Sequence, residues 1–150
     1  LKERTGARVY GRVADHAEWQ DASFAPDEAL AGGERFELGA GSTLRSIHTP
    51  GHASNHICYL LEEEKTLFTG DHVMQLTTVV INPPDGDMAA YMRSLDRLQA
   101  RGDAIFWPTH GGPIRDPEGR AVAAIQELSR TDFPTTAVPL DADGTLRGAP

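Results

Sequence analysis

Four short segments of the chain are typical of β-strands: two alternate apolar with polar residues, as a strand with one buried face does, and two are mainly apolar. The segments form two pairs, and the residues that connect each pair favour a turn. The pairs are residues 36–38 with 43–47, around Gly39-Ala40-Gly41, and residues 57–61 with 66–68, around the charged run 62–65. The sequence therefore predicts two β-hairpins.

The residues before the first hairpin show weaker patterns. Residues 1–5 are typical of the end of a helix, which Gly6 can close in a left-handed conformation. Residues 7–10 predict a short strand, and residues 15–33, with their Asp, Pro and Gly, predict a loop.

A helical period follows the second hairpin. An apolar stripe predicts a helix that is capped by Asp85 or Asp87 and ends near residues 101–102. The stripe consists of Met88, Tyr91, Met92, Leu95 and Leu98, which we interpret as core residues. Residues 104–107 then predict a buried strand that stops at Pro108.

The last part of the chain changes character at about residue 130. A second helix is predicted after Asp116-Pro117, with apolar positions at Val122, Ile125 and Leu128. Residues 131–150 have no periodic pattern, and we expect a poorly ordered tail there. The order of elements predicts a mixed α/β layered domain over residues 1–130.

Composition narrows the class of protein. The chain has 150 residues, 39% of them hydrophobic, and a formal net charge of -8. This acidic balance argues against a non-specific nucleic-acid binder, although bound divalent cations could still admit a phosphodiester such as RNA. Cys58 is the only cysteine, which fits a reducing compartment, and no apolar run has the length of a membrane span. We therefore expect a cytoplasmic protein that does not contact a membrane.

Three candidate metal ligands each lie in a turn after an apolar stretch. His52 follows Pro50-Gly51, Asp71 follows Gly70, and His110 lies beyond the strand that ends at Trp107. A rigid sheet can fix such ligands, and a carboxylate at Asp71 could bridge two cations. A single His in a turn is usually a surface residue and Gly-Asp is a common turn dipeptide, so the conjunction of the three positions carries the prediction.

The motifs around these residues resemble the later motifs of the metallo-β-lactamase superfamily. They are Thr49-Pro50-Gly51-His52, Phe68-Thr69-Gly70-Asp71-His72 and Pro108-Thr109-His110-Gly111. The similarity is greatest to stand-alone hydrolases such as hydroxyacylglutathione hydrolase and the β-lactamase-like protein 2 group, and it runs to about Gln126. It implies an αβ/βα sandwich and a site for two ions, zinc above all, with manganese or iron as alternatives.

The resemblance also implies a role for each ligand. His52 resembles the third histidine of the first metal site, Asp71 the bridging carboxylate, and His110 the final histidine of the second site. The chain has no His-x-His-x-Asp-His motif, which supplies the other four ligands in the family. We therefore expect an N-terminally truncated fragment that lacks the first strands of the sandwich and is nearly inactive alone.

Several other polar residues lie close to the candidate ligands in sequence. Asn55, His56 and His72 are expected to orient a ligand by hydrogen bonding or to face the substrate, although a purely structural role is equally open for each. Asp15-His16 imitates half of the missing motif but lies in a polar loop, so we do not expect it to bind metal. Residues 79–86 predict a loop at the rim of the site.

The function expected from the resemblance is metal-dependent hydrolysis, in which metal-activated hydroxide attacks an ester, a thioester or a phosphodiester. The expected substrate is a small-molecule ester or thioester, and RNA remains open. The alternative is a non-catalytic binding or assembly module derived from the same fold. An edge left open by missing strands would favour a homodimer in that case.

Overall fold

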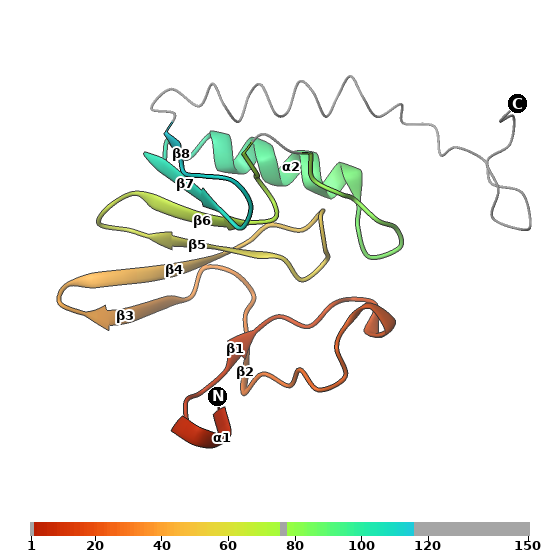
Figure 1. The fold of residues 1–150 in the computed structure, drawn as a ribbon, viewed down its shortest axis with the longest axis horizontal. Coiled ribbons are helices and arrows are strands. Elements are labelled where there is room, and N and C mark those ends of the chain that lie inside the picture. Colours follow the sequence, from red (N-terminus) through yellow and green to blue (C-terminus); the bar gives the residue numbers. More distant parts are fainter. Residues whose placement is uncertain (1, 76–77, 116–150) are drawn as a thin grey trace, which may run out of the picture.

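The computed structural model describes residues 2–75 and 78–115. Its main feature is a six-stranded sheet whose spatial order, β3-β4-β5-β6-β7-β8, is the same as the order along the chain (Figure 1). The strands are β3 (Arg35–Gly39), β4 (Ser42–His48), β5 (Ile57–Leu61), β6 (Thr66–Gly70), β7 (Ile105–Pro108) and β8 (Ile114–Arg115). Neighbouring strands are antiparallel except β6 and β7, which are parallel and are joined across helix α2 (Met88–Gln99).

Both predicted hairpins are confirmed. In the first, Phe36 pairs with Leu44, and the turn has positive φ angles at Gly39, Ala40 and Gly41. In the second, Tyr59 pairs with Phe68, and the turn places Lys65 at φ 49°. The alternation of the first hairpin and the apolar runs around the charged turn of the second therefore marked the strands and their connections correctly.

Helix α2 begins at the second of the two predicted caps. The Asp87 side chain accepts a hydrogen bond from the Ala90 amide over 2.6 Å, which satisfies one of the free N–H groups at the helix start. Asp85 instead accepts from the amide and the hydroxyl of Ser54. The helix ends at Gln99, two residues before the predicted region, and Gly102 follows at φ 69°.

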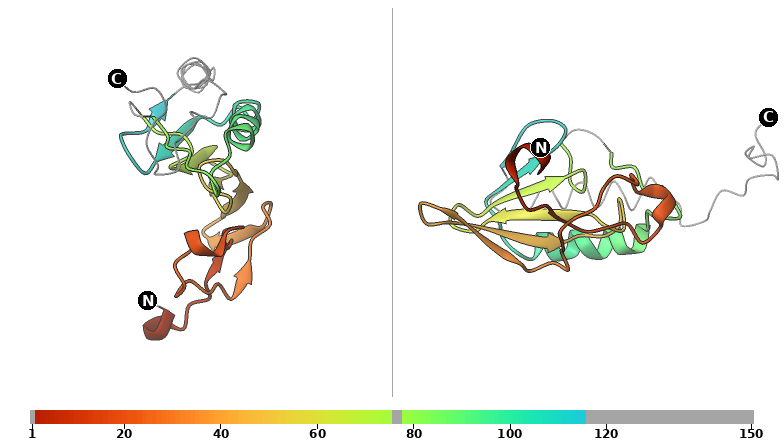
Figure 2. Two further views of the ribbon diagram at one scale, coloured as in Figure 1. Left: turned by 90° about the vertical axis from the view of Figure 1, so that its right-hand side faces the viewer. Right: turned by 90° about the horizontal axis from the view of Figure 1, so that it is seen from below.

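The hydrophobic core lies between α2 and one face of the sheet (Figure 2). Alternate strand residues such as Cys58, Leu60 and Leu67 point into it, and Leu95 and Leu98 of the helix are fully buried against them. Burial of one such leucine contributes roughly 1.5–3 kcal/mol to the stability of the fold, so the apolar face of the helix fixes the position of α2 against the sheet. Of the stripe predicted from the helical period, Tyr91, Leu95 and Leu98 are buried and Met88 and Met92 are partly buried, while Ser94 is buried as well.

The N-terminal region differs from the prediction in detail. Helix α1 (Lys2–Thr5) ends as predicted, because the Gly6 amide donates to the Lys2 carbonyl with φ 67° at Gly6. The strand predicted over residues 7–10 is wrong except at its last residue, since β1 covers only Tyr10–Gly11.

Two elements of the predicted loop 15–33 are regular structure. They are the 3-10 helix Ala17–Trp19 and β2 (Glu28–Ala29), which pairs in parallel with β1. Strand β8 was also not predicted. Strands of two residues carry no alternation, so their pairing comes from tertiary structure alone. The helix predicted after residue 117 and the tail 131–150 lie outside the described residues.

Candidate metal centre

The three candidate ligands follow three strands that run in the same direction. Strand β4 is antiparallel to β5, β5 is antiparallel to β6, and β6 is parallel to β7. The carboxyl ends of β4, β6 and β7 therefore meet at one edge of the sheet (Figure 1). His52, Asp71 and His110 each lie in the loop that leaves one of these ends.

Asp71 and His110 lie next to each other at this edge. The His110 Nε2 atom is 3.6 Å from the Asp71 Oδ1 atom, and the Thr109 amide donates to the Gly70 carbonyl over 3.0 Å. Asp71 Oδ1 is buried but has no hydrogen-bond partner among the described residues. A buried carboxylate oxygen without a partner is costly, and a cation would satisfy it. Two atoms that bind one tetrahedral ion at about 2.1 Å lie about 3.4 Å apart, so the observed separation suits a shared ion.

His52 is held with one ring nitrogen available. Its Nδ1 atom lies 2.6 Å from the Val80 carbonyl oxygen. A carbonyl can only accept, so Nδ1 carries a proton, and in the neutral imidazole Nε2 then has the lone pair that a metal ligand requires. The rim loop expected over residues 79–86 thus contacts the site through the backbone of Val80.

The loop that carries His52 is pressed against α2. Gly51 has φ 144°, and a Cβ atom there would lie 2.2 Å from the Tyr91 Cα atom. Only glycine fits this approach. The contact with helix α2 thereby fixes the position of the loop that carries His52.

The donor types fit a divalent ion of the zinc, manganese or iron kind, since two imidazoles and one carboxylate are ligands that such ions accept. The described residues contain no group of three or more His, Cys, Asp or Glu side chains placed to hold an ion. The structure brings Asp71 and His110 together as a pair and does not add His52 to them as a third member. The assignment of all three as ligands stays a prediction.

Two further histidines form a layer below the candidate ligands. His72 is fully buried, and its ring centroid lies 4.7 Å from that of Tyr91 and 5.3 Å from that of His56. Burial lowers the pKa of His72 to about 3, with the neighbouring His56 and His52 as smaller causes. His72 is therefore neutral at pH 7 and lies among packed rings, away from solvent.

His56 connects this layer to the strands. Its Nδ1 atom lies 2.8 Å from the Thr49 hydroxyl, and that hydroxyl also contacts the Cys58 sulfur at 3.2 Å. Burial lowers the pKa of His56 to about 4, with the neighbouring His52 as a smaller cause. The His56 Nε2 atom is 2.8 Å from the place where a Cβ atom would stand at Gly70, so the glycine before Asp71 makes room for this imidazole.

The remaining residues singled out in the sequence make structural contacts. The Asn55 amide group donates to the Arg12 carbonyl and the Gln20 side chain, so it fastens the N-terminal segment. His16 lies 3.7 Å from Glu18, and with Asp15 and Gly51 it lines a 220 Å³ cavity.

Sequence reasoning missed the contacts of Thr49 and Tyr91 with His56 and His72. Neither residue type is a usual metal ligand, and each fits an ordinary core or strand position.

No helix among residues 2–75 and 78–115 combines the length and the apolar character that crossing a membrane requires.

Comparison with known families identifies the superfamily to which this chain belongs. Residues 1–110 match the model of the metallo-beta-lactamase superfamily. The chain belongs to this superfamily. The fold confirms the assignment, because the sheet with α2 on one face is part of the metallo-beta-lactamase α/β sandwich.

Related proteins of this superfamily include named hydrolases. The chain is 38% identical to the atrochrysone carboxyl ACP thioesterase AgnL7 of Paecilomyces divaricatus over 124 residues. These residues make up 83% of this chain and 35% of the relative. The chain spans about a third of the length of the curated relatives that it matches first. Hydrolase activity is therefore a property of the family, and thioester hydrolysis is the activity named in this relative.

Solved structures support the same fold. A metallo-beta-lactamase family protein from Thermus thermophilus superposes with a TM-score of 0.60 at 33% identity, over 71% of this chain and 36% of that one. The protein TTHA1623, solved in a di-iron-bound form, superposes with a TM-score of 0.63 at 20% identity, over 88% of this chain and 68% of that one. Metal binding is thus documented for a protein with this fold.

Proposed function

We propose that this chain contributes His52, Asp71 and His110 to the metal site of a thioester hydrolase. The observation that carries the proposal is the buried Asp71 Oδ1 atom, which lacks a hydrogen-bond partner among the described residues and lies 3.6 Å from His110 Nε2. The proton on His52 Nδ1, directed at the Val80 carbonyl, supports a ligand role for His52 Nε2. The superfamily assignment supports the same three residues.

A bound divalent ion would supply acidity, since it lowers the pKa of water toward neutrality and polarises a carbonyl oxygen. The chain's own residues would hold and orient that ion. Asp71 offers the only carboxylate of the three residues, and His110 places a second donor beside it. The neutral His56 and His72 pack behind the site without adding a positive charge that would repel a cation.

Zinc is the ion that we propose first. Two imidazoles and a carboxylate are also the ligand types of non-haem iron, and TTHA1623 was solved with two iron ions. We propose iron and manganese as alternatives, which metal analysis of the purified protein would distinguish.

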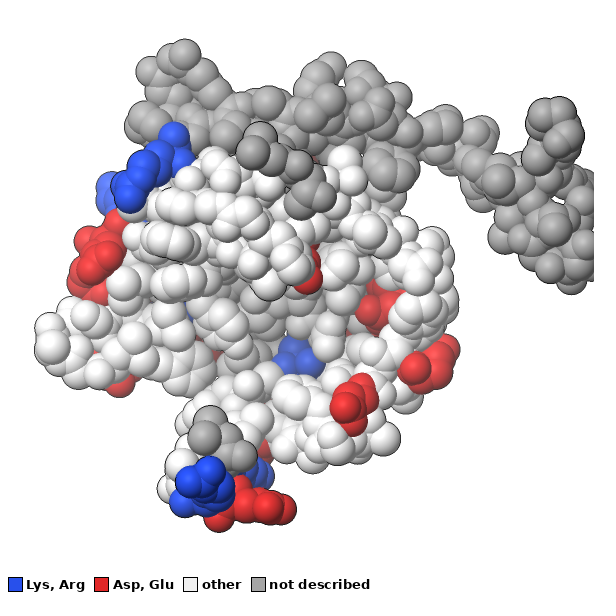
Figure 3. Space-filling view, in the orientation of Figure 1, with Lys and Arg blue, Asp and Glu red and all other residues white. Residues whose placement is uncertain are grey.

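A thioester is the substrate class that the relatives favour. AgnL7 and further relatives are named as acyl carrier protein thioesterases. The net charge of -8 disfavours a polyanionic substrate such as RNA, because a negative surface lowers the rate at which polyanions approach. On the face shown in Figure 3, the basic side chains of the described residues lie in separate small groups, some with acidic ones beside them. We therefore propose a small acyl thioester in preference to a phosphodiester.

Zinc binding tests the proposed ligands. The metal-free chain would be titrated with zinc in competition with a chelating dye, for the wild type, Asp71→Asn, His110→Gln and the control His16→Gln. We expect weak binding by the wild type, at least about tenfold weaker binding for Asp71→Asn and His110→Gln, and no more than about a twofold change for His16→Gln. Equal affinity of Asp71→Asn and the wild type would contradict the proposal.

Hydrolysis tests the proposed chemistry. The zinc-loaded chain would be assayed with an acyl-N-acetylcysteamine thioester, a β-lactam and a phosphodiester. Because only three of the family's seven ligands occur in the sequence, we expect slow, zinc-dependent hydrolysis of the thioester that is lost in Asp71→Asn. Hydrolysis that needs no metal, or that Asp71→Asn leaves unchanged, would refute a metal-dependent thioesterase.

A non-catalytic assembly module is the second candidate, and one observation favours it. Phe68 and Trp107 are paired in register on β6 and β7, on the sheet face away from α2, and are 43% and 42% exposed. Neighbouring exposed aromatic side chains are typical of contact surfaces. Light scattering combined with metal analysis separates the two functions. Metal in the monomer supports the hydrolase, and metal only in a dimer supports assembly.

A further inference from the structure

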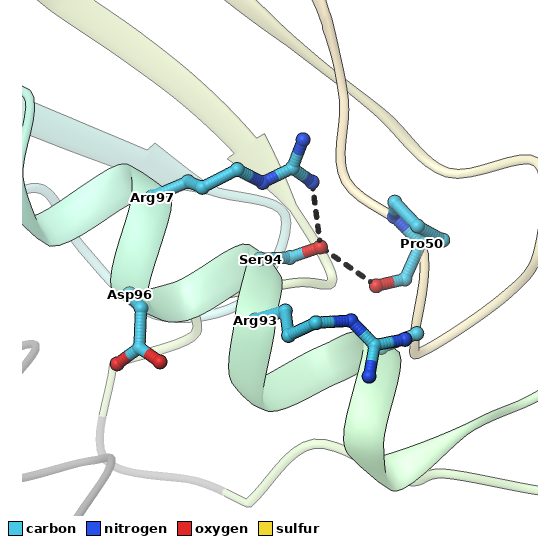
Figure 4. Close-up of a pocket in the computed structure, with 6 residues that line it drawn as sticks. Pro50, Arg93, Ser94, Asp96 and Arg97 are labelled. Atoms are coloured by element: carbon cyan, nitrogen blue, oxygen red, sulfur yellow. Dashed lines mark hydrogen bonds between the residues drawn. The ribbon is translucent and has the colours of Figure 1, made fainter.

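A second concave site lies between helix α2 and the loop that carries His52. Figure 4 shows its lining, which is Pro50, Ala90, Arg93, Ser94, Asp96 and Arg97. The cavity has a volume of about 510 Å³ and contains none of the candidate metal ligands. A bare phosphate or sulfate ion would leave much of this space empty.

Two arginines dominate the charge of this cavity. Arg93 and Arg97 are four residues apart on α2, so their side chains lie on one face of the helix. Like charges at this spacing destabilise a helix unless something neutralises them. Asp96 also lines the cavity, but Figure 4 shows its carboxylate pointing away from both guanidinium groups. The lining thus holds two basic side chains and one acidic one, in a chain with 14 basic residues against 22 acidic ones.

The two arginines differ in how firmly they are held. Arg97 donates to the His48 carbonyl over 3.0 Å and to the Ser94 hydroxyl over 3.1 Å. Ser94 is itself buried and donates to the Pro50 carbonyl over 2.8 Å. Arg93 is exposed and makes no hydrogen bond or ion pair with a described residue. One guanidinium is thus fixed in advance, and the second is free to close on a ligand.

The chemistry of the lining identifies an anion with an apolar extension. Guanidinium groups match phosphate oxygens in two parallel hydrogen bonds, and they do so better than ammonium groups. Pro50 and Ala90 supply an apolar wall beside the charges. A phosphate ester with a flexible aliphatic part would use both features.

We propose that this cavity binds the phosphate end of a thioester-carrying arm, of the class represented by pantetheine 4′-phosphate. The choice of this ligand rests on the proposed function, because an acyl group on a carrier protein is held as a thioester at the end of such an arm. The cation pair and the cavity themselves do not depend on it. The site adds to the metal centre a separate point of substrate recognition.

Calorimetry on the metal-free chain tests this site, with a chelator present so that phosphate cannot bind an ion at Asp71. The probes are pantetheine 4′-phosphate, pantetheine without phosphate, and inorganic phosphate. We expect the phosphorylated compound to bind at least about tenfold more tightly than pantetheine, and inorganic phosphate to compete with it. Equal affinity for the two pantetheine compounds would overturn the proposal.

The variant Arg93→Gln assigns the binding to this cavity. Arg93 makes no contact that the fold needs, and glutamine keeps a high helix propensity, so the variant should fold. We expect its affinity for pantetheine 4′-phosphate to fall about tenfold, while the control Arg45→Gln, which removes an exposed charge from β4, changes it less than about twofold. Equal losses in both variants would indicate a diffuse charge effect and would overturn the site.

The outcomes separate this site from the proposed function. If the chain hydrolyses thioesters but shows no phosphate-dependent binding, the proposed hydrolase function stands and the proposed recognition site in the cavity is wrong. Binding that Arg93→Gln abolishes, in a chain that hydrolyses no thioester, would keep the phosphate site and remove the thioesterase.

Discussion

The hydroxyl of Tyr91 donates a hydrogen bond to the backbone carbonyl of His72 over 3.0 Å. Tyr91 is only 1% exposed, and its ring packs on the His72 ring with centroids 4.7 Å apart. Its backbone lies directly against Gly51. A single residue of α2 therefore braces two loops, the one that carries His52 and the one that carries Asp71.

Replacement of Tyr91 by Phe tests this brace. The change keeps the ring but leaves the buried His72 carbonyl without its donor, which should lower the free energy of unfolding by about 1–2 kcal/mol. Zinc affinity should fall as well, because the Asp71 loop loses an anchor. Urea denaturation and zinc competition would measure the two effects.

Tyr10→Phe is the matched control for this variant. Tyr10 packs on the Phe36 ring at 4.9 Å, and its hydroxyl makes no hydrogen bond with a described residue. We expect its unfolding free energy to change by less than about 0.5 kcal/mol and its zinc affinity to remain that of the wild type. A similar loss of zinc affinity in both variants would contradict the bracing role of the Tyr91 hydroxyl.

Glu34 makes stability depend on pH in the acid range. Its carboxylate accepts from the Ser46 hydroxyl and from the amides of Ala31 and Gly32. The Ser46 hydrogen bond is the main reason that the pKa of Glu34 falls from 4.5 to about 2. A carboxyl whose pKa is lower in the folded state stabilises the fold above pH 4.5 and loses this contribution as the pH falls toward 2.

Glu34→Gln isolates this contribution. We expect the difference in melting temperature between wild type and variant to be largest above pH 5 and to shrink steadily between pH 4.5 and 2. Thermal unfolding by circular dichroism over this range measures it. A difference that stays constant with pH would show that Glu34 does not titrate in this window.

The sequence predicted the elements whose pattern extends over several residues. The first hairpin and α2 carry enough alternation or helical period to be identified, and the second hairpin is marked by apolar runs around a charged turn. The three candidate ligands could be assigned to loops because each follows a predicted strand. The pairing of β1 with β2 could not be found, since two residues define no period. The role of Tyr91 was also hidden. Its apolar position in α2 indicated core, while its contacts with Gly51 and His72 connect residues 40 and 19 positions away and arise only from packing.

Cys58 should be unreactive until the protein unfolds. Its thiol is fully buried, and it contacts the Thr49 hydroxyl at 3.2 Å and the Thr69 carbonyl at 3.6 Å. Burial raises the pKa of Cys58 to about 12, so the reactive thiolate is nearly absent at pH 7. We expect labelling by a disulfide reagent to follow the rate of unfolding and to become complete in denaturant. Rapid labelling of the native protein would show that the β5 core is open.

A comparison of Gly51 with Gly33 distinguishes backbone strain from steric clash as the cost of an alanine substitution. Both have φ in the range that favours glycine, 144° at Gly51 and 111° at Gly33. A Cβ atom at Gly33 would meet nothing within 4 Å, whereas at Gly51 it would lie 2.2 Å from Tyr91 Cα. Alanine at Gly33 should therefore cost only backbone strain, about 1–2 kcal/mol, and alanine at Gly51 should cost at least about 2 kcal/mol more.

Zinc affinity distinguishes the two alanine variants further. Gly51→Ala must push the Pro50-Gly51-His52 loop away from α2, so His52 should move and zinc should bind less tightly, whereas Gly33→Ala should bind zinc like the wild type. Urea denaturation gives the stability difference, and chelator competition gives the affinity. Equal destabilisation by the two variants, with unchanged zinc binding in both, would mean that the contact between Gly51 and Tyr91 does not set the position of His52.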